Sequence, residues 1–179
     1  MTTTISGSTG VNQITDDAIT AAKLPTGSVI QVVENFSATS VAFSCPIGSA
    51  SALYGLQIGR VYADLTSVTI TPTNANSKFY IAISCGTGGT SPSNRGAFGI
   101  ALVKDNTTGY ERATYPWYPA ASSVSNYGPD QNQTHIVDAT SASAVTFYFK
   151  GYMYNEGSGN TAQSGSFRNA QITVMEIAG

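Results

Sequence analysis

Residues 78–86 read KFYIAISCG, and this stretch decides the fold because apolar side chains occupy every second position in it. Phe79, Ile81, Ile83 and Cys85 fall on one side, and the residues between them fall on the other. A period of two is that of a β-strand, whose successive side chains point to opposite faces. We therefore predict a strand with one face in a core.

The same period recurs before and after this stretch. Residues 144–154 place Val145, Phe147, Phe149 and Met153 on one side. Their opposite side is an aromatic surface, either solvated or against another subunit. Turn-forming residues separate these runs, and only layered sheets bury so many one-faced strands. We predict an all-β antiparallel sandwich, jelly-roll-like, with strands at 28–34, 41–45, 65–71, 78–86, 97–104, 144–154 and 170–177.

The segment 105–143 is less regular and contains Pro116, Pro119 and Pro129. It is too long for a plain connection in a compact domain. Two interpretations stay open for it. It is either a functional loop, or it contains one or two further strands, for example around 135–138.

The N-terminal part has a different character. Residues 1–13 are rich in Thr, Ser and Gly and have little to bury, which is typical of an extended tail. Residues 14–24 predict a short helix, since acidic residues stand in the first turn and Pro25 follows the end. Eleven residues are few for a helix that stands alone, so it needs a partner. Its apolar stripe consists of Ile14, Ala18, Ala21 and Leu24.

Composition argues against several classes of partner. Charged residues make up 10% of the 179 residues and the net charge is −2, whereas soluble domains average about 25% charged. Nucleic acids and anionic lipids need clustered Lys and Arg, so we expect neither as a partner. No apolar run approaches a membrane span, and the N-terminus lacks the features of a secretory signal. We expect assembly in a cytoplasm.

Residues that could carry chemistry are few. His135 is the single histidine, and no nucleophile elbow, HExxH or CxxC pattern is present. Cys45 and Cys85 are too few for a zinc site of their own and are expected to be buried thiols. We predict no enzyme activity, no cofactor and no metal, and we interpret His135 as a hydrogen-bonding residue in or beside a strand.

An aromatic run is the densest unusual feature. Residues 110–119 read YERATYPWYP, and Tyr127 follows shortly after. Aromatic rings held on a proline-stiffened loop suit the stacking faces of sugars, so Tyr115, Trp117, Tyr118 and Tyr127 are candidate glycan-binding residues. The alternative stays open that these rings fill a gap between sheets or a subunit interface, where Tyr and Trp are also enriched.

Four blocks of the sequence carry a resemblance to a known family. They read ITDDAITAAKLPTGSVIQVV (14–33), VTITPTNANSK (68–78), VDATSASAVT (137–146) and AQITVMEIAG (170–179). As a set, they resemble the fibre-like structural proteins of tailed bacteriophages, especially aquatic phages and cyanophages. Residues 111–133 depart from the family's pattern and form the variable part.

The resemblance implies a non-enzymatic virion protein that is assembled as a homotrimer in the host cytoplasm. Residues 1–26 would trimerise and attach to other virion proteins, and residues 27–179 would form the exposed β-sandwich head of a tail or head fibre. A host-surface glycan would be the ligand of the head. Two alternatives stay open: a capsid or tail decoration or adaptor protein without a receptor role, and a free carbohydrate-binding module, or lectin.

Overall fold

The computed structural model describes residues 24–45, 60–90, 96–112, 125–155 and 163–179, in which nine strands and no helix occur. The predicted helix at 14–24, apart from Leu24, and the tail at 1–13 lie outside the described residues. The strands are β1 (Val29–Ser37), β2 (Val41–Cys45), β3 (Arg60–Ile70), β4 (Lys78–Thr90), β5 (Gly96–Lys104), β6 (Thr108–Arg112), β7 (Ser125–Asp138), β8 (Val145–Asn155) and β9 (Gln163–Ile177).

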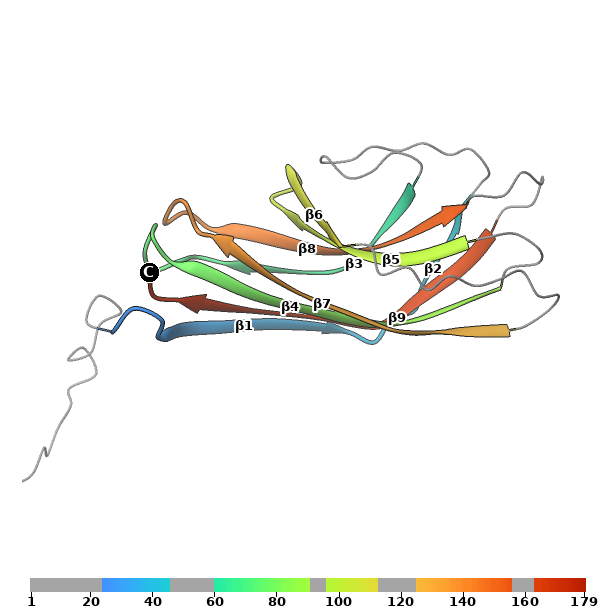
Figure 1. Ribbon diagram of the computed structural model, residues 1–179, viewed down its shortest axis with the longest axis horizontal. Coiled ribbons are helices and arrows are strands. Elements are labelled where there is room, and N and C mark those ends of the chain that lie inside the picture. The colour runs from blue at the N-terminus through green and yellow to red at the C-terminus, as the bar shows by residue number, and fades with distance from the viewer. Residues whose placement is uncertain (1–23, 46–59, 91–95, 113–124, 156–162) are drawn as a thin grey trace, which may run out of the picture.

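The strands form two antiparallel sheets, stacked as two layers in Figure 1. Sheet A has the order β1-β9-β4-β7, with β2 paired to β9 in line with β1, and sheet B has the order β3-β8-β5-β6. The strand pairs are nested like the two arms of one long hairpin. From the tip outward they are β5 with β6, β4 with β7, β3 with β8, and β1 with β9. A long hairpin rolled into two sheets is a jelly roll, so the predicted fold class is confirmed.

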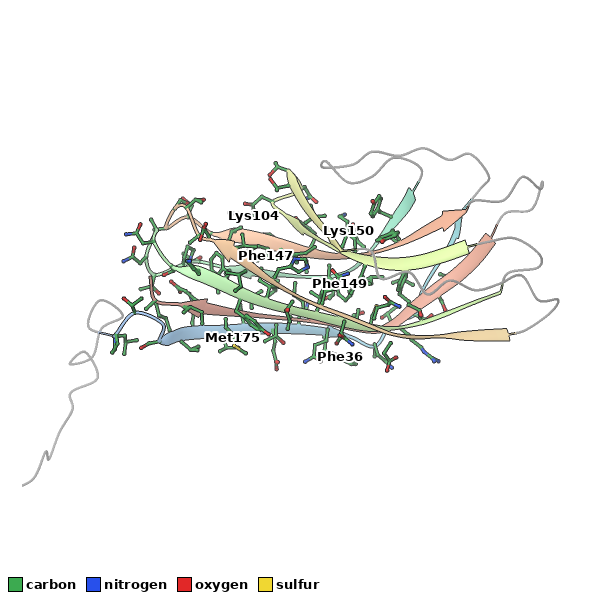
Figure 2. The ribbon with its side chains drawn as sticks, viewed as in Figure 1. Phe36, Lys104, Phe147, Phe149, Lys150 and Met175 are labelled. Carbon is green, nitrogen blue, oxygen red and sulfur yellow. The ribbon has the colours of Figure 1, made fainter. Side chains whose placement is uncertain are left out.

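The core lies between the sheets and is built by the predicted alternation. Phe79, Ile81, Ile83 and Cys85 of β4 are all buried. Phe147 and Phe149 of β8 point toward them from sheet B (Figure 2), and the rings of Phe79 and Phe147 meet edge to face at 5.4 Å. Large apolar side chains such as these rings contribute most of the free energy that burial of the core provides.

The main difference from the predicted strands concerns 105–143. Of the two interpretations, the structure confirms the further strands, because β6 and β7 both fall in this segment. Asp105 and Asn106 have positive φ angles of 48° and 53° and form the turn between β5 and β6. Left-handed turn residues match the twist of a tight hairpin, which explains why a strand follows this chain breaker directly.

The two ends of the sandwich differ. Val29, Ile177, Lys78 and Asp138 are register partners at one end, where the first described residues and the C-terminus also lie (Figure 1). We call this the proximal end. At the opposite, distal end, Thr90 of β4 pairs with residues of β7 and β9.

Candidate functional site

The predicted aromatic site lies mostly outside the described residues, because Tyr115, Trp117 and Tyr118 fall between 113 and 124. Tyr127 lies in β7, where its backbone pairs with Gly88 of β4 toward the distal end. The glycan-binding role of these four residues stays a prediction. Topology adds that Arg112 ends an edge strand of sheet B and Ser125 begins an edge strand of sheet A, so the connection runs from one sheet to the other.

Of the predicted trimerisation residues, only Leu24 is described, and Ile14, Ala18 and Ala21 lie outside. Leu24 is half-buried and lies five residues before Val29, where β1 begins at the proximal end. The residues between them are fixed to the sheet: the Gly27 N–H donates to the Ala178 carbonyl at 2.9 Å. Gly27 has a φ of 90°, which glycine adopts without steric cost.

The outer face of sheet A carries a transverse row of apolar side chains, one from each strand. Val32 of β1 pairs with Met175 of β9, Met175 pairs with Tyr80 of β4, and Tyr80 pairs with Ile136 of β7. Ile136 is 70% exposed, Val32 52% and Tyr80 37%. Figure 2 shows Met175 on the outer face of the sheet, pointing away from the core.

The neighbouring row at the proximal end extends this surface. Val29 is 51% exposed and pairs with Ile177, which faces outward like Met175 two residues before it. We define the apolar patch as Val29, Val32, Tyr80, Ile136, Met175 and Ile177. Scattered exposed apolar residues are ordinary, but four exposed and two half-buried apolar side chains that are contiguous on one sheet face indicate an interaction surface.

Charges border the apolar patch on two sides. Lys78 of β4 and Asp138 of β7 are register partners in the proximal row, and Glu34 of β1 lies one row beyond Val32. Thr173, Ala82 and Thr134 stand in register with Glu34, so this row lacks large apolar side chains and separates the patch from the exposed Phe36, two residues beyond Glu34 on β1. Sequence reasoning missed the patch because its residues come from four strands that only the register brings together.

The outer face of sheet B is different, because its aromatic side chains cover one another. Tyr152 is 1% exposed and its ring stacks at a tilt on Tyr62, with centroids 5.5 Å apart. A Cβ atom at Gly99 would overlap the Tyr152 ring, so the glycine makes room for it. Of the two predicted states of this aromatic face, solvated or against another subunit, neither describes Tyr152, which is buried within its own chain.

Lys150 is also buried on this outer face, and its ammonium is neutralised. Its Nζ forms an ion pair with the Asp64 carboxylate of β3 and lies 5.6 Å from the centroid of the Tyr148 ring. A buried ammonium needs such a partner, because desolvation of an unpaired charge is costly. The predicted division of β8 into an apolar core side and an aromatic side is confirmed for residues 145–152, and the side chain of Met153 lies outside the description.

Strand β7 turns polar side chains inward. Gln131, Gln133 and His135 are buried, and His135 Nε2 lies 3.2 Å from Gln133 Oε1. The amide of Gln133 is 3.5 Å from the carbonyl of Ile100 in sheet B. The interpretation of His135 as a hydrogen-bonding residue in a strand is confirmed, and the polar inward side explains why apolar periodicity does not reveal β7.

A buried carboxylate sits near the proximal end. Glu176 of β9 is fully buried and accepts hydrogen bonds from Gln31 Nε2 at 2.6 Å, the Thr73 N–H at 2.8 Å and the Thr73 hydroxyl at 3.2 Å. Burial by itself acts to raise the pKa of Glu176, but the polar groups of Ser77, Gln31 and Thr73 outweigh it and hold the pKa below 4.5, its ordinary value. The carboxylate therefore ties β9 to β1 and to the turn before β4.

Cys85 is buried and free, as predicted, and the side chain of Cys45 lies outside the description. Burial, together with the nearby Asp130 carboxylate, raises the pKa of the Cys85 thiol to about 12. Within the described ranges, no three His, Cys, Asp or Glu side chains are grouped so that they could hold a metal ion. The described residues also contain no helix that could span a membrane.

Comparison with known proteins gives the following. No protein-family model matches the chain. No curated protein matches it. Among solved structures, the chain is similar to infectious bursal disease virus of the Gx strain, with 16% identity over 85% of this chain and 34% of that chain, at a TM-score of 0.49.

A second solved structure, the VP2 subviral particle of infectious bursal disease virus, also has 16% identity and a TM-score of 0.49. This match covers 83% of our chain and 33% of the other. The chain thus spans about a third of the length of both structures. At such identities and TM-scores, the likeness carries no inference about function.

Proposed function

We propose that this chain is a virion structural protein of a tailed bacteriophage, a subunit of a homotrimeric tail or head fibre. The observation that carries the proposal is the jelly roll with an uncovered apolar patch on the outer face of sheet A. Jelly rolls serve as capsid and lectin domains, in which a rigid sandwich presents surfaces to other molecules. The resemblance of four sequence blocks to phage fibre proteins supports the same class.

The patch supports assembly rather than a solitary domain. Val32 and Ile136 are each more than half exposed at opposite edges of sheet A, with Met175 and Tyr80 between them. Covering such side chains removes apolar area from water, which stabilises association by about 25 cal/mol per Å² before its costs. Like copies commonly supply the cover in closed symmetric assemblies.

The two ends of the sandwich differ in a way that suits a fibre, with attachment at one end and ligand binding at the other. Leu24 leads into the proximal end, so the segment 1–26 would trimerise the chains and attach them to other virion proteins there. Ser125 and Thr90 mark the distal end, where β7 begins after the aromatic run. A head whose attachment and aromatic segments emerge at opposite ends suits a fibre that binds a host-surface glycan at its tip.

Light scattering on the full chain after size exclusion tests the assembly. We expect the measured mass to equal that of three chains. We expect the trimer to dissociate when a charged residue is substituted into the apolar patch. A single chain at all concentrations, or a stable dimer, would contradict the trimer.

A glycan array tests the proposed ligand of the distal end with the variants Trp117→Ala and Tyr115→Ala. We expect the wild type to bind a subset of glycans and both variants to lose that binding. Phe36→Ala is the matched control, because it removes an exposed aromatic ring that lies outside both the aromatic run and the apolar patch. Absence of binding by the wild type, or unchanged binding by both variants, would leave a decoration or adaptor protein as the better description.

A further inference from the structure

We propose that the apolar patch on sheet A is the receiving surface for residues 14–24 of a neighbouring copy. This inference rests on the proposed trimer, because it names the surface through which the N-terminal segments join the subunits. The segment has an apolar stripe that needs a partner, and sheet A has apolar side chains that need a cover. Each therefore supplies what the other lacks.

The dimensions of the two parts agree. A helix over the eleven residues 14–24 would be roughly 16 Å long, at 1.5 Å per residue. The four strands of sheet A span about 14 Å from the axis of β1 to that of β7, at roughly 4.8 Å per spacing. A helix lying across the strands would therefore follow the transverse row from Val32 to Ile136, with its stripe against four apolar side chains.

The described chain enters sheet A at the proximal end, close to the apolar patch. Gly27 and Ser28 are hydrogen-bonded to Ala178 at the proximal end, and the Ser28 N–H donates to the Pro25 carbonyl at 3.0 Å, which closes a turn directly before β1. Figure 1 shows the described residues before β1 at the same end of the sandwich as the C-terminus. The described chain thus reaches β1 at the proximal end, where a copy placed alongside would be within reach of residues 14–24.

Charge fixes the direction of the segment across the patch. Glu34 borders the patch at β1, whereas Lys78 and Asp138 border it at β4 and β7. If the C-terminal end of the segment lies over β1, Lys23 meets Glu34, and the acidic start lies over β7 near the Lys78 and Asp138 pair, whose charges offset each other. The opposite direction would set the acidic start against Glu34, so the first direction is favoured.

Photo-cross-linking on the full chain tests the contact. Position 21 is replaced by p-benzoylphenylalanine, and cross-linked peptides are mapped by mass spectrometry after irradiation. We expect covalent dimers on a denaturing gel, with links to residues 78–82 or 134–138 of a second chain. Links to these residues within one chain would show that the segment covers its own sheet, and links only between two N-terminal segments would place the contact elsewhere. Either result overturns the inference.

A matched pair of variants on β7 tests the patch independently. Ile136→Asp places a carboxylate in the patch, and Asn132→Asp places the same group on the same face of β7, two rows away. We expect Ile136→Asp to raise the concentration at which the assembly forms about tenfold or more, because a buried aliphatic side chain is lost. Both side chains point to solvent, so the melting temperature of the head should stay unchanged. Equal effects of the two variants would contradict the inference.

A charge exchange tests the direction. Lys23→Glu and Glu34→Lys should each weaken assembly by roughly two- to fivefold per contact, and the double variant should restore it. Failure of the double variant to restore assembly would overturn the proposed direction. Light scattering in parallel separates the two proposals: a trimer without cross-links at the patch overturns this inference and leaves the proposed function standing, whereas a monomer overturns both.

Discussion

Replacing Glu176 by Gln should destabilise the head strongly at neutral pH. The carboxylate is fully buried and accepts bonds from Gln31 and from two groups of Thr73. Gln31 Nε2 also donates to the Thr71 carbonyl at 2.7 Å, so this amide cannot turn over without losing that bond. In the variant, the amide NH₂ of residue 176 replaces one acceptor oxygen. It then faces either the NH₂ group of Gln31 or the N–H of Thr73, and that hydrogen bond is lost.

The cost follows from the strength of these bonds. A hydrogen bond to a charged group contributes about 1.5–3 kcal/mol, and a buried donor without a partner costs about 1–3 kcal/mol. We therefore expect Glu176→Gln to lower the free energy of unfolding by about 2–4 kcal/mol at pH 7. Urea denaturation at one fixed protein concentration measures this, because association would otherwise shift the midpoint. Gln171→Ala, which removes an exposed side chain of β9 outside the apolar patch, is the control and should change stability by less than about 0.5 kcal/mol.

The pH dependence of the same variant has a fixed sign. The pKa of Glu176 lies below 4.5 in the folded state, so its contribution is fully present above the pKa of the unfolded chain and is lost as pH falls through the folded pKa. The stability difference between wild type and Glu176→Gln should therefore shrink below about pH 4.3. Equal stability at pH 7, or a difference that stays constant down to pH 3, would refute the assigned role of the carboxylate.

Three further predictions concern packing and reactivity. Phe149→Ala, which empties a fully buried site, should lower the free energy of unfolding in urea by about 3–5 kcal/mol. Phe36→Ala on the outer face, where the ring is 57% exposed, should lower it by less than about 1 kcal/mol. Equal losses of stability would contradict the assigned core. Gly99→Ala should displace the Tyr152 ring and cost about 1–3 kcal/mol, and an unchanged near-UV circular dichroism spectrum would speak against it. Because burial raises the pKa of the Cys85 thiol to about 12, iodoacetamide at pH 8 should leave Cys85 unmodified by peptide mapping until urea unfolds the head, and rapid labelling of the folded chain would disprove this.

The strands with an apolar inward side were accessible from the sequence. The alternation in 78–86 and 144–154 predicted both the strands and the residues that enter the core, including Phe79 and Phe147. Strands β6 and β7 were suggested only as an alternative for an irregular segment. Strand β6 has only five residues, too few to show a clear period. Strand β7 lacks apolar alternation because Gln131, Gln133 and His135 point inward, where hydrogen bonds satisfy their polar groups.

The candidate site divides in the same way. The aromatic run and the N-terminal stripe could be picked out from sequence alone, since each is a local pattern of residue types. The apolar patch could not, because Val32, Tyr80, Ile136 and Met175 are separated by up to 143 positions and meet only through the register of four strands. The same holds for Glu176, whose partners come from β1 and from the turn before β4.

Local side-chain periodicity determined the class of fold, because the order of consecutive residues shows whether a strand has one apolar face. Pairing between distant strands decided everything that spans the sheet: the jelly-roll order, the inward polar side of β7, the buried carboxylate and the open patch. The physical reason is that burial and hydrogen bonding depend on which segments meet in space. A short-range pattern specifies the faces of a strand, but only the assembled sheets specify what each face contacts.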